Sequence, residues 1–198
     1  MIELQDKHLI AVSGPRACYL HPNDSSKVIK IVRGKTLFKR KDANWQEWRH
    51  YNYLLRRHGL LDFVNECFGF VQTNLGQGLV WRCVRDVNGV ISSTVTRIMN
   101  HPDHYDLMAV EKELQRFCRF ITEKNIQLFD LNPLNVLIRV RADGAYEAVC
   151  ADIKGRYANH ELIPISTHIP FFSKRKLKRR CGELLDRYSA FMKTRTKI

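Results

Sequence analysis

An aspartate and an asparagine lie five residues apart in the segment Asp130-Leu-Asn-Pro-Leu-Asn135. Pro133 prevents a helix from continuing through this segment, so we predict a loop. A loop aspartate can accept the proton of a hydroxyl nucleophile, and the amide oxygen of an asparagine can ligate Mg²⁺. The segment therefore predicts a catalytic base at Asp130 and a metal ligand at Asn135.

Three further side chains can complete this chemistry. Asp152 ends a strand that we expect to pair with residues 136–140, which would bring its carboxylate near Asn135 as a second hard oxygen ligand. Lys30 lies on a predicted strand near the N-terminus and can supply a cation for phosphate groups. Glu47 lies on the next predicted helix, and we expect it to form an ion pair with Lys30. Together these residues predict a site for ATP and Mg²⁺.

The strands that must position these residues follow from alternation and turn residues. Residues 27–32 alternate Val28, Lys30 and Val32 against their neighbours, which is typical of a strand. Residues 11–20 predict two short extended pieces around a turn at 13–15, and residues 68–72 and 78–84 predict a hairpin. Residues 136–140 and 148–152 predict a second hairpin, around Asp143 and Gly144.

Two helices are predicted by apolar spacing. Trp45, Trp48 and Leu55 recur at helical intervals, with Asp42 or Asn44 as the cap and Gly59 as the stop. The clearest helix covers roughly residues 106–125, where one apolar stripe is formed by Leu107, Val110, Leu114, Phe117 and Ile121. The residues beyond Asp152 are predicted to be helical at most.

This order of elements predicts an α+β chain that forms a single domain, residues 1–198. We expect residues 1–85 to form an N-terminal lobe, mainly antiparallel sheet with one helix. Residues 86–198 would form a C-terminal lobe that carries the catalytic and metal-binding loops and a basic C-terminal segment.

Composition favours an ordinary globular protein, because 44% of the residues are hydrophobic and 27% are charged. No apolar run approaches the ~20 residues needed to span a bilayer, and residues 1–12 contain charges that a signal peptide would lack. The six cysteines are scattered singly and predict reduced core residues. We therefore expect a cytoplasmic protein, peripheral at the inner membrane if it binds lipid.

The net charge of +13 predicts anionic partners. Six basic residues occupy a stretch of seven, namely Lys174, Arg175, Lys176, Lys178, Arg179 and Arg180. A second cluster comprises Lys27, Lys30, Arg33, Lys35, Lys39, Arg40 and Lys41. An anionic glycolipid or membrane surface is one interpretation and a solvated basic face is the other. Nucleic acid is less favoured, because the basic stretch lacks interleaved aromatic residues.

The site residues resemble those of the protein-kinase-like superfamily, in which Asp-x-x-x-x-Asn precedes a hairpin and a metal-binding Asp. That resemblance implies a truncated two-lobed kinase-like fold with Lys30 as the strand lysine and Glu47 as its partner. Asp130 would be the base, and Asn135 and Asp152 the metal ligands. Gly14 stands where the loop that covers the phosphates is expected.

A closer resemblance covers nearly the whole chain. The segments that carry it are Cys18-Tyr-Leu-His-Pro22, Val28-Ile-Lys-Ile-Val32, the hairpin 76–84 and Asn132-Pro-Leu-Asn-Val-Leu137. They are similar to the YrbL family, a Gram-negative group linked to the PhoP regulatory network. Membership implies a role in the response to low magnesium and envelope stress. A phosphotransferase acting on an anionic envelope acceptor, such as the lipopolysaccharide core, is one function consistent with it.

The departures from the kinase pattern favour an alternative. Leu128 and Phe129 stand where His-Arg or His-Gly precedes the catalytic Asp, and Gly14 is the lone glycine of its loop, followed by proline. Asp152-Ile-Lys-Gly155 replaces Asp-Phe-Gly. A pseudokinase that senses nucleotide and regulates a partner is therefore the second hypothesis. Taken singly, Lys30 would be an edge-strand lysine, and Asp130 or Asp152 a turn cap.

Overall fold

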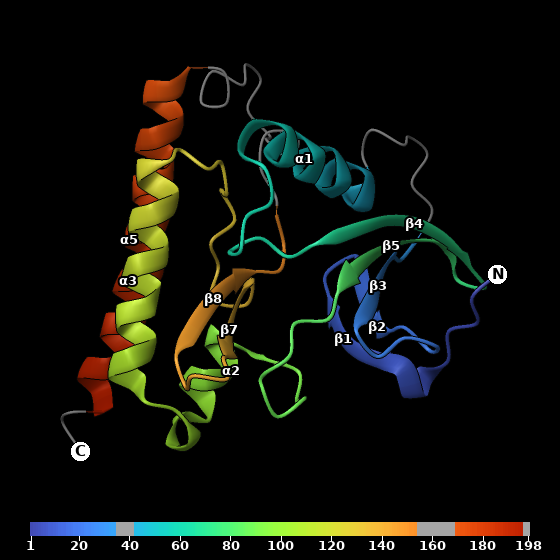
Figure 1. The fold of residues 1–198 in the computed structure, drawn as a ribbon, viewed down its shortest axis with the longest axis horizontal. Coiled ribbons are helices and arrows are strands. Elements are labelled where there is room, and N and C mark those ends of the chain that lie inside the picture. Colours follow the sequence, from blue (N-terminus) through green and yellow to red (C-terminus); the bar gives the residue numbers. More distant parts are fainter. Residues whose placement is uncertain (35–41, 154–168, 196–198) are drawn as a thin grey trace.

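The computed structural model describes residues 1–34, 42–153 and 169–195. Its first sheet is antiparallel throughout, with the strand order β1-β2-β3-β5-β4 (Figure 1). The strands are β1 (Leu9–Ser13), β2 (Arg16–Leu20), β3 (Lys27–Val32), β4 (Cys67–Thr73) and β5 (Gly76–Arg82). The predicted hairpins at 11–20 and 68–84 are thereby confirmed.

Strand β3 is covered on both faces. Ile29 and Ile31 are buried in a small cluster with Leu4 and Val80. Val28 points into the main core instead, and Lys30 follows it on the same face. Opposite Lys30 stand Cys18 of β2 and Leu79 of β5. The predicted alternation therefore places Lys30 on the same face of β3 as Val28 and Val32, at the middle of the sheet.

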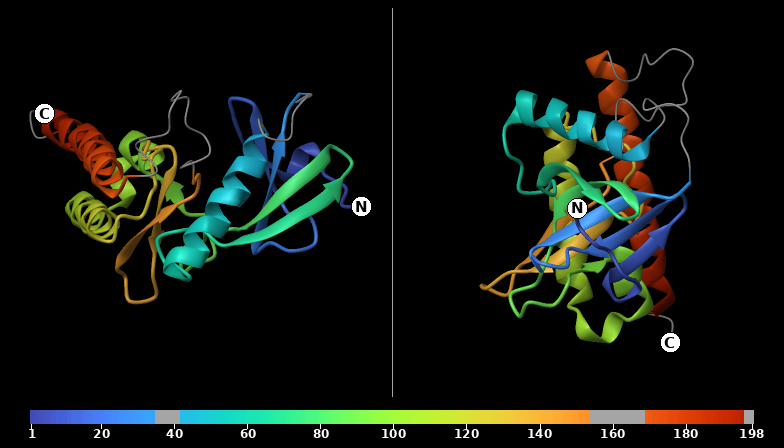
Figure 2. Two further views of the ribbon diagram at one scale, coloured as in Figure 1. Left: turned by 90° about the horizontal axis from the view of Figure 1, so that it is seen from above. Right: turned by 90° about the vertical axis from the view of Figure 1, so that its right-hand side faces the viewer.

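Helix α1 (Ala43–His58) packs against β3, β4 and β5 and covers this sheet (Figure 2). Asp42 is the N-cap, since its carboxylate accepts a hydrogen bond from the Trp45 amide at 3.0 Å. Gly59 ends the helix with φ +73°, a left-handed conformation that glycine adopts without strain. The same helix turns the Glu47 side chain toward β3.

The second sheet has the order β6-β7-β8, from β6 (Ser93–Thr94), β7 (Val136–Val140) and β8 (Tyr146–Cys150). Asp152 was predicted to end this strand. It lies two residues beyond β8 instead, because the last pair of the ladder is Val136 with Cys150. The short helix α2 (Val95–Asn100) follows β6 directly. In the part of the chain that the structure describes, η1 (Asp6–His8) and η3 (Pro102–His104) are short 3₁₀ turns.

Two long helices, α3 (Leu107–Glu123) and α5 (Pro170–Arg195), lie side by side, and α3 packs against β8 of the second sheet (Figures 1 and 2). The predicted apolar stripe of α3 is confirmed: Val110, Leu114, Phe117 and Ile121 are all fully buried. The facing stripe of α5 consists of Leu177, Cys181, Leu184 and Tyr188. This helix runs for 26 residues within the stretch that was predicted to be helical at most, and its inward face completes the core.

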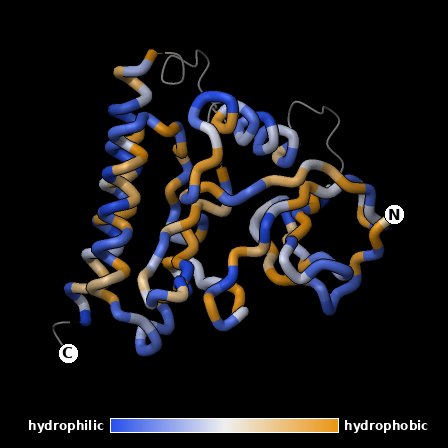
Figure 3. Tube along the Cα trace, in the orientation of Figure 1, coloured by the Kyte–Doolittle hydropathy of each residue, from blue (hydrophilic) through white to orange (hydrophobic). Residues whose placement is uncertain are grey.

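The main core runs from the first sheet to α3 and α5 without interruption. The strands of the first sheet all precede residue 85 and those of the second sheet follow it. Figure 3 shows hydrophilic and hydrophobic residues interleaved along the strands and along the helices. Among the described residues no helix is both long enough and apolar enough to cross a membrane.

The close packing of β5 on β3 makes a stability prediction. A methyl group at Gly78 would approach Ile29 Cγ2 to 2.4 Å and Ile31 Cδ1 to 2.9 Å. We expect Gly78→Ala to lower the free energy of unfolding by about 1–3 kcal/mol through overpacking. Gly182→Ala in α5 meets no neighbour within 4 Å and should raise it by about 0.5–1 kcal/mol. Urea unfolding measures both, and equal effects would contradict the packing of β5 on β3.

Candidate functional site

A cleft of about 520 Å³ opens between the two sheets. One part of its lining is apolar and another is charged or polar. The apolar residues include Val28, Val84, Ile91 and Leu137, and the charged or polar ones include Arg16, Lys30, Asn135 and Asp152. A cleft with both linings suits a ligand that has an apolar ring at one end and an anionic group at the other.

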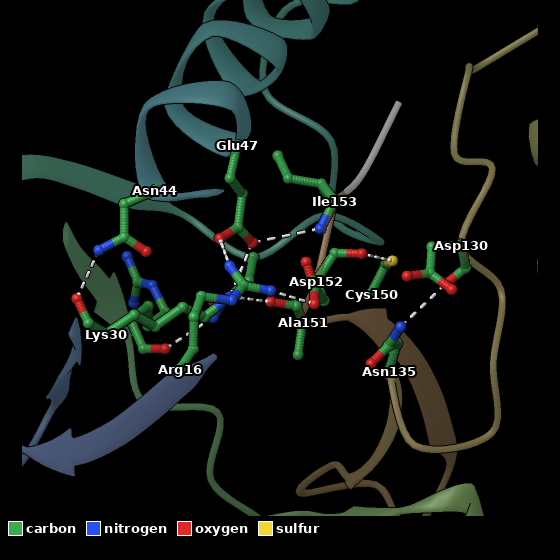
Figure 4. Close-up of polar contacts among 12 residues, drawn as sticks. Arg16, Lys30, Asn44, Glu47, Asp130, Asn135, Cys150, Ala151, Asp152 and Ile153 are labelled. Carbon is green, nitrogen blue, oxygen red and sulfur yellow. Dashed lines mark hydrogen bonds and ion pairs between the residues drawn. The ribbon is translucent and has the colours of Figure 1, made fainter. Parts of the chain in front are cut away.

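The ion pair predicted between Lys30 and Glu47 is present. Lys30 Nζ lies 2.7 Å from Glu47 Oε1 and also donates to the Ala151 carbonyl at 2.7 Å. The side chain of Glu47 is fully buried, whereas that of Lys30 is 13% exposed. Glu47 therefore holds the ammonium group of Lys30 (Figure 4), and Lys30 also lines the cleft.

Arg16 is a second cation of this site, and the sequence analysis missed it. Its Nη1 donates to Glu47 Oε2 at 2.6 Å, and its Nη2 donates to Asp152 Oδ2. Burial opposes the charge of Arg16, but the carboxylates of Glu47 and Asp152 outweigh this effect and raise its pKa above the ordinary value. The available signal was register, since Arg16 and Cys18 share one face of β2 and Cys18 pairs with Lys30.

The segment after β8 closes the network. Ile153 donates its backbone amide to Glu47 Oε1 at 3.2 Å, and Ala151 holds Lys30 through its carbonyl. Asp152 lies between Ala151 and Ile153 in the sequence, and its carboxylate pairs with Arg16 (Figure 4). Within the described residues, two cations and two carboxylates thus meet from β2, β3, α1 and the segment after β8.

The loop that carries Asp130 is fixed by its own backbone. Asn135 Nδ2 donates to the Asp130 carbonyl at 3.3 Å, and the Asn135 carbonyl accepts from the Ala151 amide at 2.8 Å. The second contact brings Asn135 beside the segment of Asp152, as predicted. Asp130 is half-buried and is not among the residues that line the cleft. Its predicted role as a base stays a prediction.

Helix α1 is also tied to this loop. The buried His50 donates from Nε2 to the Gln127 carbonyl at 2.7 Å, three residues before Asp130. Leu128 and Phe129 are buried. Apolar residues at these positions therefore serve the core, whereas the kinase pattern has a polar pair.

The remaining predicted residues are placed as follows. Gly14 forms the turn between β1 and β2 with φ +53°, and its neighbours Ser13 and Arg16 line the cleft. Cys18 also lines the cleft, and burial raises the pKa of its thiol to about 11, so it is protonated at neutral pH. Gly155 and the basic residues Lys35, Lys39, Arg40 and Lys41 lie outside the described residues.

The kinase-like resemblance implies Mg²⁺, and the side chains fit it in kind. Asp152 and Asn135 offer hard oxygen atoms on the wall of one cleft. Within the described residues no group of three or more His, Cys, Asp or Glu side chains is placed to hold a metal ion. An ion at Asp152 would therefore need Asn135, phosphate oxygens and water as further ligands, as Mg²⁺ sites on nucleotides commonly do.

The structure defines a mixed α/β protein in which two antiparallel sheets flank a cleft with a buried ion-pair network. A family model described as "PhoP regulatory network protein YrbL" matches residues 2–189, so the chain belongs to this family. The YrbL proteins of Escherichia coli K12 and Shigella flexneri are each 27% identical over 181 residues, 90% of this chain and 84% of theirs. The resemblance to the YrbL family is thereby confirmed.

Removal of the shared carboxylate tests the network. Glu47→Gln leaves Arg16 and Lys30 without their common buried partner, which typically costs about 3–5 kcal/mol of unfolding free energy. Glu66→Gln is the matched control, because Glu66 pairs with the exposed Arg82 and should cost about 0–1 kcal/mol. Urea unfolding measures both variants. Equal losses would show that the Glu47 contacts do not hold α1 to the sheets.

Proposed function

We propose that this protein binds a nucleoside triphosphate with Mg²⁺ in the cleft, in the manner of a small kinase-like protein with two lobes and a truncated C-terminal lobe. The observation that carries the proposal is Lys30, an accessible cation held by a fully buried glutamate on the wall of the cleft. A structural ion pair would not require the cation to face a cavity of this size. The nearby oxygen ligands supply the second element of a triphosphate site.

Each part of the cleft has a role in this proposal. Val28 and Leu137 would pack against the base, and Lys30 would bind the phosphates, with Glu47 as its positioning residue. Asn135 and Asp152 would hold Mg²⁺, which supplies charge stabilisation to the phosphates. In the enzyme version of the proposal, Asp130 takes the proton of an acceptor hydroxyl. The basic charge favours an anionic envelope acceptor, consistent with the link of the family to the PhoP network.

A nucleotide-sensing module is the second candidate. The observation that favours it is the placement of Asp130, which is half-buried, carries its carbonyl bond to Asn135 and does not line the cleft. A protein of this kind would bind nucleotide at the same residues and act through a partner. Binding and phosphotransfer must therefore be tested separately.

Nucleotide binding is tested by thermal unfolding. Millimolar ATP with Mg²⁺ should raise the melting temperature by mass action, and ATP alone should raise it less. Lys30→Ala should abolish the shift. Lys27→Ala is the control, because Lys27 lies on the same strand but pairs with Asp24 at the surface. No shift of the unmodified protein by ATP with Mg²⁺ would overturn both candidates.

Asp130→Asn separates the two candidates. The asparagine keeps the size of the side chain but cannot take a proton. An enzyme should lose phosphotransfer by at least ~100-fold and retain the thermal shift with ATP and Mg²⁺. Transfer of radiolabelled γ-phosphate, or ATP hydrolysis, measures this. Equal rates in the variant and the unmodified protein would remove Asp130 from the reaction.

The start of α5 supports a further proposal, contact with an anionic membrane surface. Phe171, Lys174, Arg175 and Lys178 are exposed at helical spacing on the outward face of α5. Phe171 is 69% exposed, and its ring packs against the exposed Phe172. Exposed aromatic rings beside several cations are typical of helices that lie on lipid headgroups. The basic stretch therefore has an apolar neighbour that a solvated face does not need.

Vesicle binding tests this surface. Replacing Lys174, Arg175, Lys178 and Arg179 by glutamine should weaken binding to vesicles of anionic lipid and flatten its salt dependence. The reason is that the Debye length falls from ~10 Å at 0.1 M salt to ~3 Å at 1 M. Removal of the same charge from exposed positions elsewhere is the control, at Arg49, Arg56, Arg57 and Arg119. Equal loss in both variants would show a bulk charge effect, and loss of ATP binding would place the helix in the nucleotide site.

A further inference from the structure

Arg16 occupies the carboxylate that a metal ion would need. Its guanidinium does not form a bidentate pair with one carboxylate. It bridges two carboxylates instead, donating to Glu47 through Nη1 and to Asp152 through Nη2. The Arg16 side chain is 11% exposed and the Asp152 side chain 14%. A divalent cation at Asp152 and the guanidinium at the same oxygen would be two like charges in contact, at a depth where water screens poorly.

The two carboxylates differ in how they depend on Arg16. Glu47 keeps Lys30 at 2.7 Å and the Ile153 amide at 3.2 Å if Arg16 leaves. Asp152 accepts Arg16 at Oδ2, so a metal ion that binds this oxygen would replace the positive charge that Arg16 supplies there. The network can therefore exchange Arg16 for a metal ion at Asp152 while Glu47 stays neutralised.

The Arg16 side chain can reach a ligand in the cleft if it leaves Asp152. Its backbone is fixed by pairing with Val32, but its side chain lines the cleft, two residues after the Gly14 turn. A guanidinium binds phosphate oxygens through two parallel hydrogen bonds and gains as much from them as from a carboxylate. A polyphosphate in the cleft offers Arg16 a new partner at the moment when a metal ion takes Asp152.

We propose that Arg16 is an internal counter-ion that competes with divalent metal for Asp152 and transfers to the phosphates when a nucleotide with its metal binds. This inference rests on the proposed function for its second half, the transfer to phosphate. Its first half, competition for Asp152, stands on the ion pairs alone. Arg16 thus supplies a positive charge to Asp152 in the metal-free protein and sets how tightly Asp152 holds metal.

Manganese binding without nucleotide tests the first half. Mn²⁺ replaces Mg²⁺ at oxygen sites and is counted by the electron paramagnetic resonance of the free ion. Arg16→Gln should bind Mn²⁺ about 10-fold more tightly than the unmodified protein, within the range typical of coupled sites. Adding Asp152→Asn to this variant should remove the gain. Arg195→Gln, which breaks a surface pair with Asp103, is the control for the loss of one positive charge.

Arg16→Lys guards against failure of the first variant to fold, which circular dichroism would show. Lysine keeps a counter-ion near Glu47 but has a single ammonium group and cannot bridge two carboxylates, so it should give a smaller gain in the same direction. Equal Mn²⁺ affinity in the unmodified protein and the folded Arg16 variants overturns the competition. A gain that survives Asp152→Asn overturns it as well, since the metal then binds elsewhere.

ATP without metal tests the second half. The unmodified protein should bind metal-free ATP more tightly than Arg16→Gln does, by about 10-fold, because the phosphates lose a guanidinium partner. Equal affinities overturn the transfer to phosphate and leave the competition intact. If no variant binds nucleotide but the Mn²⁺ gain appears, the proposed function fails and the competition stands. If nucleotide binds and the Mn²⁺ gain is absent, the competition fails and the proposed function stands.

Discussion

The buried carboxylate of Glu47 is the constraint on which the site depends. It lies in the main body of α1, fully buried, and a charge at that depth must be neutralised and hydrogen-bonded on every side. Its partners come from β3, from β2 and from the segment after β8, through Lys30, Arg16 and the Ile153 amide. The hydrogen bonds and ion pairs of one side chain thus join α1 to both sheets beside the cleft.

A buried ion-pair network of this kind adds little to the free energy of unfolding. Buried ion pairs repay little more than the cost of removing their charges from water, and apolar residues of similar size often serve as well. The surrounding core is well supplied with such residues: Val28, Leu79 and Trp81 lie close by, and Lys30 Nζ stands 4.9 Å over the Trp81 ring. Charges that persist beside so much apolar surface, on the wall of a cleft, are better explained by what the cleft binds.

The sequence was sufficient for the features that local patterns encode. The alternation of β3 exposed Lys30 as the polar member of an apolar face, and the spacing of α1 placed Glu47 within reach of it. Arg16 was missed because a short strand with mixed polarity does not show which of its residues points inward. Only the register of β2 against β3 reveals that. The end of β8 was predicted two residues too late, at Asp152 rather than Cys150, since the extent of a strand depends on its ladder partners.

The same long-range logic applies to α5. The basic outer face of α5 was evident in the sequence, but its length was not. The apolar residues on its inner face are buried only because the apolar face of α3 packs against them. The fold also gives α5 a contact that sequence could not suggest: Lys176 Nζ lies 4.8 Å over the ring of Phe129, the residue before Asp130. Phe129 is held in the core and Asp130 follows it into the loop that Asn135 fixes. The basic helix and the loop that carries Asp130 therefore meet at Phe129, whereas the basic residues of α5 do not line the cleft.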